Sequence, residues 1–287
     1  MRSMLTDKLQ TPTIIGVDFT SRPTRVKPIT IAVGSLDRQS ATLNMREILR
    51  CADMASFHTT LQDLTPWVGA FDLPFGLPRE FLAVQGWLGN NHQYTWREVT
   101  DIVLAHTRAE LVVRCKAYCD ARPPGQKFAH RKVDKLAGSS PSMKWVNPPV
   151  LYMLHAGLPA LFALDCHFPM LMTSGNQSRI ALEAYPGFIA RQITHESYKS
   201  DDRAKQTQAR EDARRQLVLA LTTKNTVTGI TLKITRTLKQ QMIADASGDS
   251  LDATICALQA AVGAMSGAPR YGMPTDVDPI EGWIVGV

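Results

Sequence analysis

The sequence predicts an α/β protein in which helices cover the faces of a mixed sheet. The chain has 287 residues, of which 44% are hydrophobic, so it can bury the core of one elaborated domain. A meander of expected strands is followed by a helix and a further strand, which is typical of a mixed sheet with crossover connections. Acidic residues end several of these strands, at the edge where open α/β sheets place their chemistry.

The first part of the chain contains the expected meander. We predict strands over residues 14–18 and 29–34, joined by a polar hairpin loop, and a weaker third strand over 41–48. A helix over 51–64 has apolar residues on one face, and a strand over 67–72 follows it.

Residues 79–178 are interpreted as a helical insertion between strands. The expected order is a helix over 78–88, a long helix from a capping box at 95–98 to about 120, a loop over 126–147 and a helix that begins at 148–149. A strand is expected at 179–183, so the insertion returns the chain to the sheet.

The remaining chain alternates helical and short apolar patterns. We expect a helix over 201–222, a strand or the start of a helix at 230–234, a helix over 251–265 and a terminal strand at 282–285. The chain contains no internal repeat, and residues 1–287 are treated as a single domain.

Four acidic residues lie where the expected elements begin or end: Asp18, Asp72, Glu183 and Asp252. Asp249 lies one helical turn before Asp252, so both can face the same site, and a helix N-terminus favours anions. Buried charges without a partner are costly. A divalent cation would remove this cost, so the pattern predicts a metal site.

Each acid also has a structural interpretation. Asp249 could cap the last long helix, Asp72 could form the turn that follows its strand, and Glu183 could accept hydrogen bonds from loop amides. Asp18 lies in an apolar strand, where a purely structural role is the least easily justified.

The positive charge is concentrated in one segment. Residues 108–144 contain nine basic and three acidic residues, a net charge of +6 that equals the charge of the whole chain. Such a segment can bind polyanions with a strong salt dependence. The alternative is a solvated insertion without a binding role.

The composition predicts a cytoplasmic protein without a membrane partner. Residues 1–10 lack the apolar core of a signal peptide, and the most apolar stretch, 149–172, is interrupted by one aspartate, two histidines and two prolines (His155, Pro159, Asp165, His167 and Pro169). Five cysteines form no paired framework. Cys115 and Cys119 could be half of a zinc site, but core packing is the favoured interpretation of this pair.

Five phrases occur in order along the chain: residues 16–21 (GVDFTS), 72–78 (DLPFGLP), 183–186 (EAYP), 251–253 (LDA) and 281–284 (EGWI). Together they resemble the family catalogued as domain of unknown function 429, over nearly the whole chain. The resemblance implies a ribonuclease H-like fold, with a mixed five-stranded sheet, flanking helices and a central first strand. It also implies a nuclease, with Asp18 as the active acid and Asp72, Glu183 and Asp252 or Asp249 around it.

These considerations predict a metal-dependent nuclease that cleaves phosphodiester bonds of DNA or RNA. Two Mg²⁺ or Mn²⁺ ions, which prefer carboxylate oxygens, would activate water and neutralise the leaving oxygen. Arg131, Lys132 and Lys144 are the expected substrate-binding residues. One alternative is a phosphotransferase of the sugar kinase and actin type, although no glycine-rich loop follows Asp18. The other is a non-catalytic nucleic-acid-binding protein.

Overall fold

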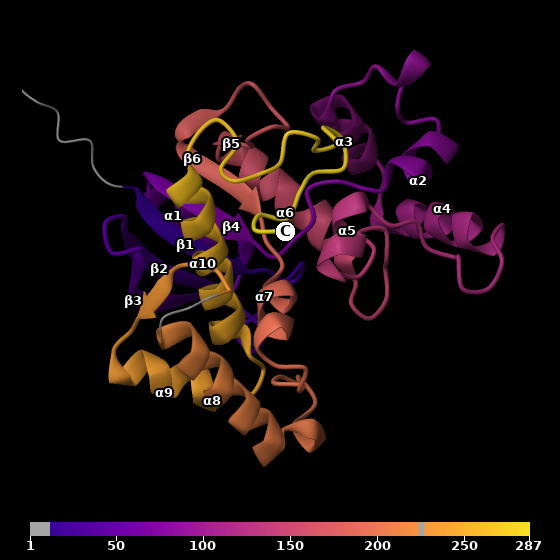
Figure 1. Ribbon diagram of the computed structural model, residues 1–287. Helices are drawn as coiled ribbons and strands as arrows, with labels where there is room; N and C mark the ends of the chain where they lie inside the picture. The colour runs from indigo at the N-terminus through magenta and orange to yellow at the C-terminus, as the bar shows by residue number, and fades with distance from the viewer. Residues whose placement is uncertain (1–11, 224–226) are drawn as a thin grey trace, which may run out of the picture.

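The computed structural model describes residues 12–223 and 227–287, and its centre is a seven-stranded open sheet (Figure 1). The strand order is β5-β6-β4-β1-β2-β3-β7. The strands are β1 (Thr13–Asp18), β2 (Ile29–Asp37), β3 (Thr42–Cys51), β4 (Trp67–Phe71), β5 (Cys166–His167), β6 (Asn176–Glu183) and β7 (Thr231–Lys233). Only β2 runs antiparallel to its neighbours among these strands.

The prediction of an α/β protein with a mixed sheet is confirmed, and the sheet has seven strands where five were expected. The two additional strands are the outermost ones, β5 and β7, which contain only two and three residues. Strands of that length carry no periodic signal. The strand alternative for residues 230–234 is confirmed by β7. The expected terminal strand is reduced to a single bridge between Glu183 and Ile284.

Ten α-helices and two 3₁₀ turns complete the described part of the chain. The helices are α1 (Met54–Asp63), α2 (Arg79–Val84), α3 (Trp96–Ala105), α4 (Arg108–Asp120), α5 (Lys132–Ala137), α6 (Val150–Ala163), α7 (Pro186–Ile193), α8 (Gln208–Thr222), α9 (Arg236–Ala244) and α10 (Asp249–Ser266). The turns are η1 (Asn90–His92) and η2 (Arg203–Lys205). Within the described ranges, no helix combines the length and apolarity needed to cross a membrane. Residues 1–10, where no signal peptide was expected, lie outside those ranges.

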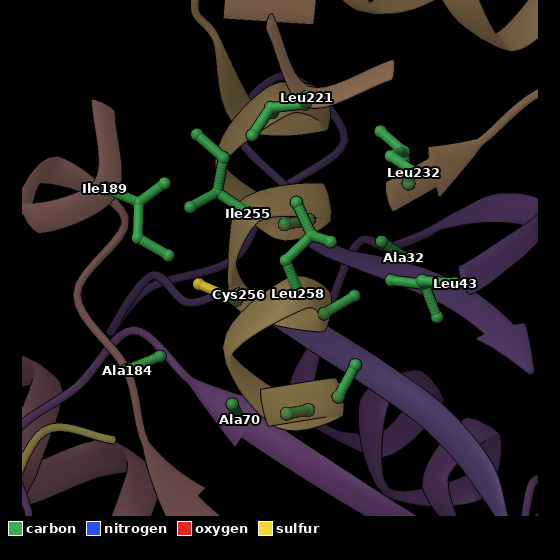
Figure 2. Close-up of a cluster of buried hydrophobic side chains, with 14 of the residues drawn as sticks. Ala32, Leu43, Ala70, Ala184, Ile189, Leu221, Leu232, Ile255, Cys256 and Leu258 are labelled. Atoms are coloured by element: carbon green, nitrogen blue, oxygen red, sulfur yellow. The ribbon is translucent and has the colours of Figure 1, made fainter. Parts of the chain in front are cut away.

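Helix α10 packs across one face of the sheet, over β1, β2 and β4 (Figures 1 and 2). Ile255 and Leu258 of this helix belong to the same buried cluster as Ala32 and Ala70 of the strands (Figure 2). The approach is so close that a Cβ at Gly16 would lie 1.9 Å from the backbone nitrogen of Ala257. Glycine in β1 is therefore required for α10 to lie against this strand.

The opposite face is covered by α1 and by helices of the long segment between β4 and β6. Phe57 of α1 and Leu158 of α6 are buried in this second core. Cys115 and Cys119 of α4 are buried in the same core. Helices α2 to α6 therefore occupy the region where the helical insertion was expected, and α2 to α5 extend to one side of the sheet (Figure 1).

Two details of this segment differ from the prediction. The capping box of Thr95 and Glu98 is present, but a second one, of Thr107 and Glu110, starts a new helix, so the expected long helix is divided into α3 and α4. Helix α5 occupies part of the expected loop. Its six residues are too few for a clear period. Its N-cap residue, Arg131, forms a local ion pair with Asp134 and a tertiary one with Glu183.

Candidate active site

Three parallel strands bring three of the predicted acids to one edge of the sheet. Asp18 ends β1, Asp72 follows β4 and Glu183 ends β6. Val17 is in register with Phe71, and Phe71 is in register with Glu183, so the three strands end at the same level. This edge is formed by the carboxyl ends of adjacent strands, where open sheets bind ligands.

The first turn of α10 adds two further acids, Asp249 and Asp252. The N-cap residue is Gly248, in the left-handed conformation, and Asp249 is the first helical residue. The alternative that Asp249 is the helix cap is therefore wrong. Its side chain instead accepts a hydrogen bond from the ammonium group of Lys27 at 2.9 Å.

The carboxyl group of Asp18 has a pKa well above its usual value. Burial is the main cause, and the negative charges of Asp252, Asp249 and Asp72 add to it, whereas Lys199 opposes it. Burial likewise raises the pKa of Asp72 to about 7, an effect that Lys199 opposes and that Asp252 and Glu183 increase. These shifts show that the acids interact across the strand ends.

Asp18 and Asp72 stand out because their carboxylates accept no hydrogen bond from any described residue. Both side chains are only partly buried. Thr30 is the cross-strand partner of Asp18, and its hydroxyl oxygen is buried without a hydrogen-bond partner in the described structure. The edge therefore contains polar atoms that are not satisfied by the protein itself.

Asp252, by contrast, is fully buried and fully paired. The hydroxyl group of Tyr198 donates to its Oδ1 atom at 2.6 Å, and the ammonium group of Lys199 donates to its Oδ2 atom. Burial alone would lower the pKa of Lys199. The charges of Asp252, Tyr198, Asp18 and Asp72 outweigh that effect and raise it well above its usual value.

The charges of this acidic site do not balance. Asp18, Asp72, Asp249 and Asp252 carry four negative charges when all are ionised, against two positive charges from Lys27 and Lys199, and Lys27 is also paired with Asp201. The excess of at least two negative charges would be offset by one divalent cation. Across residues 12–223 and 227–287, however, no three His, Cys, Asp or Glu side chains are arranged so that they could hold a metal ion. Because Lys199 is bonded to Asp252, a third carboxylate would have to exchange that ammonium group for a cation.

Glu183 belongs to a separate, buried ion-pair network. Its two oxygen atoms accept hydrogen bonds from Arg131 at 2.6 and 2.8 Å, and Oε2 also accepts one from the backbone nitrogen of Phe75 at 3.0 Å. Arg131 is also bonded to Asp134. Burial raises the pKa of Glu183, while Arg131 lowers it. The loop-amide interpretation is therefore partly correct, and the metal-ligand role of Glu183 stays a prediction.

The predicted substrate-binding residues are in three different situations. Arg131 is 2% exposed, and its guanidinium group donates to Asp134, Glu183 and the carbonyl oxygen of Glu281, so in this structure it has no free donor for a phosphate, and its substrate-binding role stays a prediction. Lys132 is exposed and paired with Asp276. The ammonium group of Lys144 donates to the carbonyl oxygen of Asn147 at 2.6 Å.

Three residues of the acidic site were missed by the sequence analysis: Lys27, Tyr198 and Lys199. Lys27 lies in the hairpin loop between β1 and β2, and the other two lie in the segment after α7. Basic and aromatic residues are common in loops, so nothing in their local sequence separates them from surface residues. Their role depends on contacts with residues 53 to 222 positions away.

Two cavities adjoin the site, and Asp72, Tyr185 and Lys199 line both of them. One, of about 290 Å³, lies against α7 and residues 194–199. The other, of about 350 Å³, lies between the strand ends and residues from 131 to 153. A molecule that enters either cavity would therefore come close to Asp72 and Lys199.

Comparisons of this chain with protein-family models, curated proteins and solved structures find no match. The resemblance to domain of unknown function 429 and the ribonuclease H-like assignment therefore stay predictions.

Proposed function

We propose that the protein is a metal-dependent nuclease whose site is formed around Asp18 and Asp72. The observation that carries the proposal is the pair of neighbouring, partly buried carboxylates that lack protein partners at the carboxyl edge of β1 and β4. Carboxylates in this condition are costly without a cation. Perturbed acids at the edge of a sheet and beside a cavity are typical of functional sites.

The sheet order supports the ribonuclease H-like part of the proposal. The five longer strands follow the order β3-β2-β1-β4-β6, in which the first strand is central and the second is antiparallel. This is the arrangement that the sequence resemblance implies. It accounts for the central position of Asp18, but it does not by itself identify a reaction.

The residues present suit Mg²⁺ or Mn²⁺ in donor type and in charge. Asp18 and Asp72 offer hard oxygen donors, and Asp252 would join them if Lys199 moved away. Such an ion would activate water and stabilise charge on a phosphoryl oxygen. The hydroxyl group of Thr30, the cross-strand partner of Asp18, is fully buried and unsatisfied, which adds an unused polar group at this position.

The excess of two negative charges supports one ion directly. The second ion of the expected pair would require Glu183 to exchange its bonds with Arg131 for metal coordination. Lys199 has a different use in the proposed site. Its side chain is 44% exposed and lines both cavities, so its ammonium group can pair with a substrate phosphate when it is not bonded to Asp252.

Affinity for nucleic acid would come from exposed lysines of the basic segment. Lys116, Lys127 and Lys135 are exposed, and their ammonium groups form no hydrogen bond or ion pair with any described residue, although Lys135 is close enough to Glu80 to lower the pKa of that carboxyl group. Arg131 and Lys132, in contrast, already have acidic partners. The three free lysines are therefore the part of the segment best suited to contact phosphates.

The test is a cleavage assay with single-stranded and duplex DNA and RNA, in Mg²⁺, in Mn²⁺ and in excess chelator. We expect cleavage only with a divalent ion, and at least a hundredfold loss of rate (about 3 kcal/mol in the barrier) for Asp18→Asn. Lys205→Met, an exposed surface change, is the matched control and should cleave normally. Full activity of Asp18→Asn would refute the proposal. Binding without cleavage under every condition would favour the non-catalytic alternative.

A further inference from the structure

The cavity of about 350 Å³ beside Asp72 combines an apolar wall with access to the acidic site. Its apolar wall is formed by Leu73, Pro74, Val150, Met153, Tyr185 and Ile284. These residues come from the turn after β4, the start of α6 and the ends of β6 and the chain. The wall is therefore assembled from segments that are far apart in sequence but meet at the strand ends.

The charged residues of this cavity divide into two groups. Arg131 is bonded to both Asp134 and Glu183, and all three side chains are buried, so these groups are already paired within the protein. Asp72 and Lys199 belong to the acidic site. A ligand in the cavity would thus contact apolar side chains on one part of its surface and the acidic site on another.

This combination suits one nucleotide of a nucleic acid. The volume is at the lower end of the range for small-molecule sites and leaves no room for a base pair. A nucleobase is planar and has apolar faces, which favour contact with aromatic and aliphatic side chains. Its attached phosphodiester would then lie toward Asp72 and Lys199, on the side of the proposed metal site.

Two polar features can contact the edge of a base. The hydroxyl group of Ser140 lines the cavity and has no hydrogen-bond partner among the described residues, so it is free to donate or accept. Tyr185 is held in place, because its hydroxyl group accepts a hydrogen bond from Arg191 at 3.0 Å and the guanidinium group lies 5.1 Å from the ring centre. A wall held in this way is suited to a rigid planar ligand.

We propose that this cavity receives one unpaired base of the substrate, so that the enzyme acts on single-stranded or locally unpaired nucleic acid. The inference rests on the proposed nuclease function, which it extends by naming the substrate class. A base in a stable duplex would have to leave its stack, at a cost of a few kcal/mol that unpaired or mismatched bases largely avoid. Discrimination would therefore favour single strands even though the cavity contacts only one base.

The first experiment measures base binding without any metal or phosphate. Adenosine and uridine are titrated into protein labelled with ¹³C at the methionine methyl groups, with ribose as the control ligand. We expect the Met153 signal to shift saturably with the nucleosides and not with ribose. No shift with either nucleoside would overturn the inference.

The second experiment blocks the cavity. Val150→Trp should weaken nucleoside binding by at least about tenfold and remove the preference for single-stranded over duplex substrate. Val113→Trp, on the exposed surface of α4, is the matched control and should bind as the parent does. If Val150→Trp does not fold, Met153→Trp serves the same purpose. A folded blocking variant that binds nucleosides like the parent would refute the proposal.

The failures of this inference and of the nuclease proposal are distinguishable. If Mn²⁺ stabilises the parent protein against heat and the protein cleaves nucleic acid but binds no nucleoside, only the base-cavity inference is rejected. Equal cleavage of single strands and duplexes would also reject the cavity alone. If the parent binds nucleosides but neither binds Mn²⁺ nor cleaves nucleic acid, the nuclease proposal is rejected.

Discussion

Lys199 donates a hydrogen bond to the fully buried carboxylate of Asp252, in the middle of a cluster of acids. The ammonium group supplies positive charge at the place where a bound cation would supply it. Lys199 and a metal ion would therefore compete for Asp252. This relationship, which no sequence pattern indicates, explains how the acids can coexist in the absence of a metal ion.

Replacing Lys199 by Met should make the metal-free protein less stable than the metal-free parent. It should also increase the stabilisation that a bound metal ion provides. Loss of one partner of a buried pair typically costs about 3–5 kcal/mol, and we expect about 1–3 kcal/mol here because solvent reaches Lys199. Mn²⁺ should then raise the melting temperature of the variant more than that of the parent. Thermal melting with and without Mn²⁺ measures both effects, with Lys205→Met as the exposed control. Equal Mn²⁺ shifts in variant and parent would show that Lys199 does not compete with the ion.

Replacing Asp18 by Asn should leave the metal-free protein at least as stable as the parent. The carboxylate has no hydrogen-bond partner among the described residues, and its ionised form is disfavoured by burial and by Asp252. The variant should also gain less stability from Mn²⁺ than the parent does. A large loss of stability without metal would show that Asp18 is a structural residue. An unchanged Mn²⁺ shift would show that it is not a ligand.

Asp72 should make the metal-free protein less stable as the pH rises. Its pKa is raised to about 7 from an ordinary value of 3.8, so between these values the folded state binds more protons than the unfolded state. The stability from this group is complete at low pH and is lost as the pH approaches about 7. The free energy of unfolding of Asp72→Asn should therefore rise relative to that of the parent between about pH 4 and pH 7, by about 1–3 kcal/mol. Denaturant unfolding of both proteins in chelator at several pH values measures this difference. A difference in the free energy of unfolding that does not grow with pH would contradict the prediction.

Replacing Arg131 by Met should destabilise the protein by about 3–5 kcal/mol, because Asp134 and Glu183 would remain as buried charges without a partner. Lys132→Met changes the adjacent, exposed pair with Asp276 and should cost no more than about 1 kcal/mol. Denaturant unfolding of both variants gives the comparison. Similar losses in the two proteins would show that the buried network does not hold the α5 region in place.

Neutralising Lys116, Lys127 and Lys135 together should weaken nucleic-acid binding and reduce its dependence on salt. Removal of three phosphate contacts lowers the log–log slope by at most about three units. Binding titrations at several salt concentrations measure the slope, and replacement of three exposed basic residues outside residues 108–144 (Lys205, Lys233 and Arg236) is the control. An unchanged slope would identify the basic segment as a solvated insertion.

The sequence alone predicted the elements whose signals are local. The capping box of Thr95 and Glu98, the apolar helix that became α10 and the apolar strands β1 and β4 are each specified by neighbouring residues. The division between α3 and α4 was also encoded locally, by Thr107 and Glu110, but the continuous helical pattern concealed it. Strand β5, with two residues, was too short to identify, and β7 was predicted only as one of two alternatives, because the pairing of both strands is supplied by longer neighbours.

The position of the acids could be anticipated for a similar reason. Side chains at the carboxyl ends of parallel strands share one edge of the sheet, so Asp18, Asp72 and Glu183 are brought together by strand direction and register alone. Which of them are free to bind a ligand was decided only by the tertiary structure. Arg131 comes from α5 to neutralise Glu183, and Lys199 comes from a loop to neutralise Asp252, whereas no described residue bonds to the carboxylates of Asp18 and Asp72. Ion pairing depends on distances of a few ångströms between residues far apart in the chain, and such distances exist only once the chain is folded.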